Sequence, residues 1–208
     1  MDKNTDPAYS RNVVEFVAVA NEYCKYAEHA GDIKGDEMLS ILQRILPLLY
    51  LKASLLPALE PVFEDGNEKF VSEPDWKRIN NMFRDKFGNA DLFQDLHEDR
   101  QNEPDTIISS SIAENMADIY QDLKDFLLLY QTGTREVMND AVWECRTNFE
   151  NIWGQKLVNS LKEIHRFIYS GEEIEKTGPD EGSDDETRDK SEWVISKRQK
   201  EFRGDDKE

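Results

Sequence analysis

The sequence predicts an all-α protein: an irregular bundle of about five main helices, in which the long C-terminal helix has a bulge or kink near Gly154. Apolar residues recur at steps of three and four along most of residues 9–170, as they do on the buried face of a helix. Residues typical of helix ends separate these segments. We find no convincing series of alternating apolar and polar residues, so the sequence predicts no β-strand.

The composition limits the function classes. The chain has 208 residues, with 44 acidic residues against 26 lysines and arginines, and a net charge of −18. This length suits one domain with an appendage. A nucleic-acid binder needs a basic surface to meet phosphates, so the charge predicts no nucleic-acid partner. Two cysteines are too few for a disulfide framework or a cysteine zinc site.

The first two helices are predicted over residues 9–30 and 36–56. The apolar stripe of the first comprises Val13, Val17, Ala20, Cys24 and Ala27. The second has apolar residues on almost every side, which predicts the central helix of the bundle, bent at Pro47. Arg44 and Lys52 make a membrane span costly, so we predict a buried core helix and no membrane partner.

The next segment is predicted to be a helix that begins after Ser72 as N-cap and ends at Gly88. Residues 89–105 are interpreted as a long polar connection that Leu92 and Phe93 pin to the core. A fourth helix is predicted over residues 109–131, with a regular apolar stripe.

The last helix is predicted from residue 134 to residue 170. Its apolar series runs through Met138, Val142, Cys145, Phe149 and Ile152, and resumes one residue late at Leu157, Leu161, Ile164 and Ile168. Gly154 lies at the change. A one-residue slip is typical of a π-bulge or a kink. The alternative is that the second half of the helix faces a different neighbour.

The composition changes again at Gly171. Residues 171–208 hold 14 acidic and 8 basic residues and few apolar ones. Such a segment buries too little surface to offset its ordering entropy, so we predict a helical domain over residues 1–170 and a mostly disordered acidic tail over 171–208. The segment Ser191–Phe202 is an apolar island that could form a short helix and dock on the domain or on a partner.

One acidic pattern suggests chemistry. The fourth helix carries four carboxylates on a common stripe: Glu114, Asp118, Asp122 and Asp125. Facing carboxylates can hold Mg²⁺ for phosphate chemistry. The stripe lies away from the apolar stripe, however, so we interpret it as a solvated face. His165 is interpreted as a partly buried, hydrogen-bonded residue, and no pair of histidines has metal-ligand spacing. We therefore predict no catalytic, cofactor-binding or metal-binding residues and no cofactor.

Two stretches resemble a bacterial all-α family known only as a domain of unknown function. These are A-D-I-Y-Q-D-L-K-D (residues 117–125) and N-F-E-x-x-W-G-x-x-L-V (residues 148–158). The resemblance covers residues 9–170 and implies a helical fold and a bacterial cytoplasmic setting, but it brings no activity, cofactor or site. It draws attention to Tyr120, Asp122, Trp153 and His165, which we predict to form a polar-aromatic cluster where the last two helices meet.

Three functions remain to be weighed. The first is a non-catalytic interaction or accessory module with a protein partner, since an acidic surface steers basic partners. The alternative is a metal-dependent phosphohydrolase acting on nucleotides or related phosphates. Only the carboxylate stripe of the fourth helix supports it. A third is an acidic decoy for a nucleic-acid-binding site. The lack of an export signal and of a disulfide framework predicts a cytoplasmic location.

Overall fold

The computed structural model describes residues 7–64, 66–97 and 106–175. The predicted all-α class is confirmed. The longer helices are α1 (Arg11–Glu28), α2 (Gly35–Ser54), α3 (Glu73–Phe87), α4 (Ile112–Gln131), α5 (Arg135–Asn148) and α6 (Gly154–Ser170). A π-helical turn, η5 (Phe149–Trp153), joins α5 to α6, so that these three form one long helix. Within these described residues, three 3-10 turns complete the helical elements: η2 (Pro7–Tyr9), η3 (Ala30–Asp32) and η4 (Gly88–Ala90).

The chain divides into two units after Lys176. The predicted tail beyond residue 175, with its Ser191–Phe202 island, lies outside the described residues. The first residues after α6 are bonded to the helical domain. The backbone N–H of Asn89 donates to the carbonyl of Glu175 at 3.1 Å, and the N–H of Glu175 donates to Asn89 Oδ1 at 2.9 Å.

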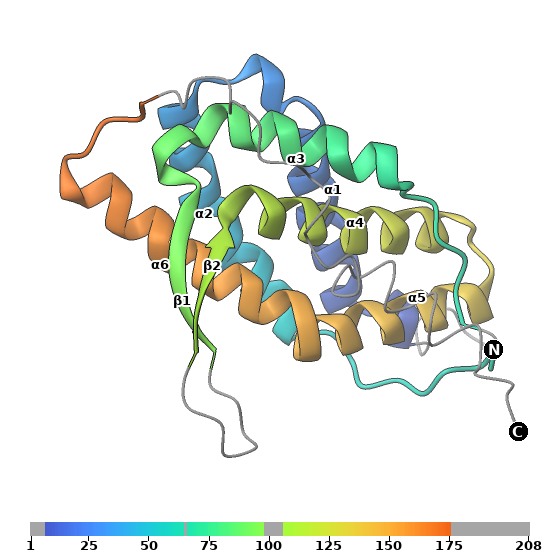
Figure 1. The fold of residues 1–208 in the computed structure, drawn as a ribbon. Coiled ribbons are helices and arrows are strands. Elements are labelled where there is room, and N and C mark those ends of the chain that lie inside the picture. The colour runs from blue at the N-terminus through green and yellow to red at the C-terminus, as the bar shows by residue number, and fades with distance from the viewer. Residues whose placement is uncertain (1–6, 65, 98–105, 176–208) are drawn as a thin grey trace, which may run out of the picture. The chain divides into compact units, whose positions relative to one another are not determined.

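The central helix is α4, and the prediction that the second helix would be central was wrong. Figure 1 shows α4 between α3 and the long helix of α5 and α6, with α1 and α2 behind it. On almost every side α4 is buried, whereas α2 buries one face against α1 and α6 and leaves the opposite face exposed. The apolar content of a helix therefore did not decide its position, because polar residues of α4 find partners on its neighbours.

A β-hairpin precedes α4, in a segment where the sequence predicted a polar connection and the start of a helix. Strand β1 (Leu92–His97) pairs antiparallel with β2 (Thr106–Ser111), with Phe93 opposite Ser110. Phe93 is buried as predicted, but Leu92 is exposed. The sequence reasoning failed here because the strands are short and their pairing joins separate segments of the chain.

The start of α4 is set by polar capping, three residues later than predicted. Ser111 is the N-cap, and its Oγ accepts from the backbone N–H of Glu114 at 3.1 Å. The buried carboxylate of Asp91 accepts from the N–H of Ala113 at 2.7 Å and from Ser111 Oγ at 2.9 Å. A carboxylate at this end also interacts favourably with the helix dipole, so one side chain links the hairpin to the central helix.

The start of α3 confirms the predicted N-cap. Ser72 and Asp75 form a reciprocal capping box, in which the side chain of each accepts from the backbone N–H of the other. Because this cap satisfies two N–H groups of the first turn, Ser72→Ala should lower the free energy of unfolding by about 1 kcal/mol. Urea denaturation measures the change. The exposed Ser54→Ala at the end of α2 is the control, and equal losses in the two variants would contradict the capping role.

The predicted bulge near Gly154 is also confirmed. The backbone N–H of Gly154 donates to the carbonyl of Phe149, five residues earlier, as in a π-turn. A Cβ on Gly154 would lie 2.4 Å from that carbonyl oxygen and 3.0 Å from the Phe149 ring. The extra residue brings Leu157 and Ile164 into the core, and it lets Lys156 reach Asp118 on α4.

Candidate functional site

The carboxylate stripe of α4 is largely buried, and its interpretation as a solvated face was wrong. Asp122 and Asp125 are only 4% and 2% exposed. The stripe meets α3 on one side and the long helix of α5 and α6 on the other. A buried carboxylate is costly unless it is hydrogen-bonded, so the partners of each group decide what the stripe does.

Two of these carboxylates hold neighbouring helices. Trp76 Nε1 on α3 donates to Asp118 Oδ1 at 2.8 Å, and Lys156 on α6 donates to Asp118 Oδ2. Asn148 Nδ2 on α5 donates to Asp122 Oδ1 at 2.9 Å. Hydrogen bonds to a charged acceptor are stronger than neutral ones. These groups therefore cross-link the bundle around α4.

Asp140 on α5 anchors an extended segment that we call the strap, residues 57–71, of which residue 65 is not described. The backbone N–H of Val62 donates to Asp140 Oδ1 at 2.7 Å, and the N–H of Phe63 donates to Asp140 Oδ2 at 2.8 Å. Both carboxylate oxygens are used. Asp140 is buried, so the strap is fixed to α5 by its main chain.

Asp125 on α4 anchors the other end of the strap in a different way. The N–H groups of Phe70 and Val71 both donate to Asp125 Oδ1, at 2.9 and 3.0 Å. Among the described residues, Asp125 Oδ2 has no hydrogen-bond partner. Burial raises the pKa of Asp125 above its ordinary value of 3.8, although the two N–H donors and the charge of Lys69 oppose this shift.

The arrangement gives no support to a metal centre. A Mg²⁺ site needs several carboxylate oxygens that converge on one point. Within the residues that the structure describes, no three His, Cys, Asp or Glu side chains are grouped so that they could hold a metal ion. Asp118, Asp122 and Asp125 instead bond to different parts of the protein. The phosphohydrolase alternative therefore gains no observation in its favour.

The residues of the predicted polar-aromatic cluster have different neighbours. The hydroxyl of Tyr120 donates to Glu28 Oε1 on α1 at 3.1 Å, and Lys124 donates to the same oxygen at 2.7 Å. Burial would raise the pKa of Glu28, but Lys124 and the Tyr120 hydroxyl together lower it. Asp122 bonds to α5, as described above. Tyr120 and Asp122 therefore serve two separate contacts of α4.

The other two members lie on the long helix. Trp153 is fully buried, and its ring centroid lies 4.7 Å from that of Phe149. His165 is exposed, contrary to the partial burial expected from sequence, and its ring lies 4.6 Å from that of Tyr169. A common cluster of Tyr120, Asp122, Trp153 and His165 stays a prediction, and it does not supply the candidate site.

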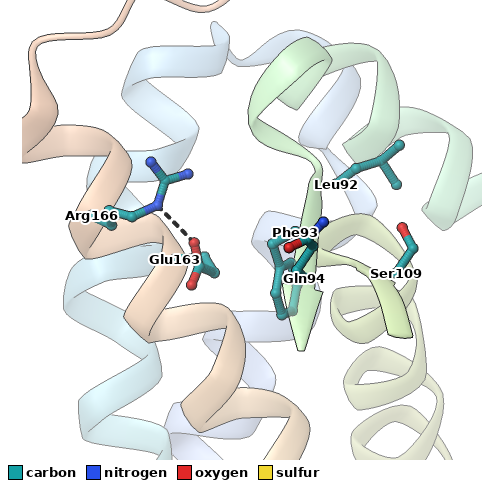
Figure 2. Close-up of a pocket in the computed structure, with 6 residues that line it drawn as sticks. All are labelled: Leu92, Phe93, Gln94, Ser109, Glu163 and Arg166. Carbon is teal, nitrogen blue, oxygen red and sulfur yellow. Dashed lines mark hydrogen bonds and ion pairs between the residues drawn. The ribbon is translucent and has the colours of Figure 1, made fainter. Parts of the chain in front are cut away.

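An open groove of about 390 Å³ lies between the hairpin and α6. Figure 2 shows its lining, which comprises Leu92, Phe93, Gln94, Ser109, Glu163 and Arg166. The groove has a charged pair on one wall, where Arg166 donates to Glu163 at 2.8 Å. Arg166 also pairs with Glu172 at 3.4 Å. The guanidinium is thus already engaged by two carboxylates, so the groove offers little unmet charge to a small ligand.

The outward face of α2 exposes apolar side chains at helical spacing. We call Leu48, Leu51 and Leu55 the leucine ridge. They are 43%, 52% and 43% exposed, although the sequence predicted them in the core. Adjacent apolar side chains in solvent are typical of interaction surfaces. The spacing of three and four residues, on the side opposite the buried residues of α2, is the signal that could have identified the ridge from sequence.

Buried α2 residues opposite the ridge include Leu42, Leu46 and Ala53. The ridge therefore lies on the outer side of a helix whose other face packs against α1 and α6. None of the helices in the described part of the chain is long and apolar enough to cross a membrane.

Comparisons with known proteins agree with the fold. A family model described as "Domain of unknown function (DUF5063)" matches residues 7–170, which confirms the family resemblance of the sequence. A crystal structure of protein BF1032 from Bacteroides fragilis is similar to this chain at 36% identity, with a TM-score of 0.71. The match covers 80% of this chain and 98% of that one. Comparison with curated proteins gave no match.

Proposed function

We propose that this chain, which belongs to the DUF5063 family of domains of unknown function, is a non-catalytic interaction or accessory module that binds a protein partner through the leucine ridge. The observation that carries the proposal is the exposure of three leucines at helical spacing on the outer face of α2. A monomer gains nothing from leaving such a face in water, whereas a partner that covers it removes apolar surface from solvent.

The carboxylates support the same proposal. The charged groups that first suggested metal chemistry bind Trp76, Lys156, Asn148 and the main chain of the strap. These contacts hold the bundle together, so the carboxylate stripe is not itself a candidate binding surface.

The proposal includes a bacterial cytoplasmic setting. Cys24 and Cys145 are both buried, and neither forms a disulfide within the described residues. Burial raises the pKa of the Cys24 thiol well above its ordinary value, which keeps it in the unreactive thiol form. Unoxidised cysteines are typical of a reducing compartment. Fractionation of the native host tests this part of the proposal, and recovery of the protein outside the cytoplasm would contradict it.

A matched pair of variants tests the binding role. Leu51 on the ridge and Val14 on α1 are 52% and 54% exposed. Leu51→Lys places a charge in the ridge, while Val14→Lys places the same charge at an equally exposed site on another helix. Neither change removes a buried side chain, so both variants should keep the fold.

The partner is first identified by affinity capture from the native host at low and moderate salt, and its direct binding is then measured with purified proteins. We expect Leu51→Lys to weaken this binding at least about tenfold, as for a central apolar contact. Val14→Lys should bind as the unaltered protein does. If both variants bind equally well, the leucine ridge is not the binding surface.

A further inference from the structure

We infer that the leucine ridge receives a single amphipathic helix of another protein, whose apolar stripe has heptad spacing and whose flanks are mainly basic. This inference rests on the proposed function and names the class of partner. It follows from the spacing of the ridge, its size and the charge of the chain, considered in turn.

The spacing fits a helix. Ile41 and Arg44 precede Leu48, Leu51 and Leu55 at steps of three and four, so these positions form a heptad seam. The seam spans 15 residues, and its first and last positions are about 21 Å apart at the rise of an α-helix. A partner helix of about four turns would cover it. Such a seam packs side by side with a second helix and has no need of a deep pocket.

The size of the ridge argues against a second copy of this chain as the occupant. A stable protein–protein interface buries about 800 Å² on each partner, from about 20–30 residues. The ridge offers three half-exposed leucines. Contact between two ridges would therefore be too small to hold a dimer, whereas transient recognition of one helix needs less area.

The net charge of the chain predicts that the flanks of the partner helix are basic. Two copies of a chain with a net charge of −18 repel each other, while a basic partner is attracted. Lys52 on the flank of the ridge is already neutralised, because it bonds to Glu15 on α1 at 2.6 Å. Exposed Glu37 lies on the outward face one turn before Ile41 and would meet a basic residue.

Arg44 sets the register of the partner. It is exposed and interrupts the apolar seam between Ile41 and Leu48. A guanidinium at this point favours a carboxylate opposite it. The partner helix therefore carries one acidic residue facing Arg44, between apolar positions, with basic residues along its edges.

Designed peptides and the full chain test the inference. The probe is a synthetic four-turn helix with leucines at heptad spacing, lysines on both flanks and one glutamate placed to face Arg44. A second peptide has glutamates in place of the flanking lysines, and a third has the same composition with the leucines out of register. Fluorescence anisotropy measures the Kd of each at low and moderate ionic strength.

We expect the basic peptide to bind at least about tenfold more tightly than the other two. Leu51→Lys and Leu48→Lys should weaken its binding at least about tenfold, and Val14→Lys should bind as the unaltered protein does. Equal binding of the basic and acidic peptides would overturn the inference. So would an equal loss in Val14→Lys, because binding would then follow the overall charge alone.

Two further outcomes separate this inference from the proposed function. If Leu51→Lys loses the native partner but the unaltered chain binds none of the peptides, the ridge is an interaction surface and its assigned occupant is wrong. If sedimentation velocity shows a dimer of the unaltered chain that Leu51→Lys converts to a monomer, the occupant is a second copy. If Leu51→Lys changes neither binding nor assembly, both proposals fail.

Discussion

Gly154→Ala should lower the free energy of unfolding by about 3 kcal/mol, because a Cβ at this position would lie 2.4 Å from the carbonyl oxygen of Phe149. To relieve the clash, the π-turn must open and lose the hydrogen bond from Gly154 to Phe149. Any opening also displaces Phe149 and fully buried Trp153, whose rings pack together. Urea denaturation and the Tm measure the loss.

Gly31→Ala is the control for this substitution. A Cβ on Gly31 would have Met82 Sδ as its near neighbour at 3.5 Å, an ordinary contact. We expect this variant to remain within about 0.5 kcal/mol of the unaltered protein. If Gly154→Ala were as stable as Gly31→Ala, the glycine would not be required by the π-turn.

Asparagine should have different effects on stability at the two aspartates that anchor the strap. In Asp140→Asn an amide NH₂ replaces one of two oxygens that each accept from a backbone N–H, so two donors face each other. We expect a loss of about 2 kcal/mol. In Asp125→Asn the single accepting oxygen is kept, and the amide nitrogen takes the place of the oxygen that has no hydrogen-bond partner among the described residues. The change should be within about 0.5 kcal/mol or stabilising.

The pH dependence of stability provides a second measurement for Asp125. Its pKa is raised in the folded protein, so the folded state holds the proton more tightly than the unfolded chain does. The contribution of Asp125 to stability is therefore greatest below its ordinary pKa of 3.8 and falls as the pH rises through its folded pKa. Asp125→Asn should remove this fall and gain stability relative to the unaltered protein between about pH 4 and pH 7.

Urea titrations of both variants across this range carry the test. A loss in Asp125→Asn as large as that in Asp140→Asn would show that both oxygens of Asp125 are needed. Limited proteolysis within the strap gives an independent readout, because a weakened anchor at Asp140 should expose residues 57–71 to cleavage while the helices stay protected.

The helices and the π-turn could be predicted because their signals are local. The apolar period located each helix, and the capping residue Ser72 marked a start that the structure confirms. The slip between Ile152 and Leu157 is visible in the sequence, since one extra residue displaces every later apolar position. Gly154 indicated the position of this slip, because the Phe149 carbonyl oxygen approaches so closely there that a side chain has no room.

The hairpin, the exposed face of α2 and the buried carboxylate face of α4 were not predicted, because each depends on partners that are distant in sequence. A helix pattern shows which residues share a side, but not which helix lies at the centre. The sequence placed α2 there because it is more apolar, and it placed Asp122 and Asp125 in solvent because they are charged. In the structure α4 is central, and Asn148 and the strap each donate to one oxygen of those carboxylates. Because α4 and not α2 lies at the centre, the outward face of α2 is left exposed as the leucine ridge.

The strap also bears on how sequences of this family can diverge. Asp140 and Asp125 hold it through peptide N–H groups, which every residue except proline possesses. The side chains of Val62, Phe63 and Phe70 point to solvent and make no demand on these anchors. Relatives should therefore tolerate wide substitution at such positions, short of proline, while the two aspartates persist.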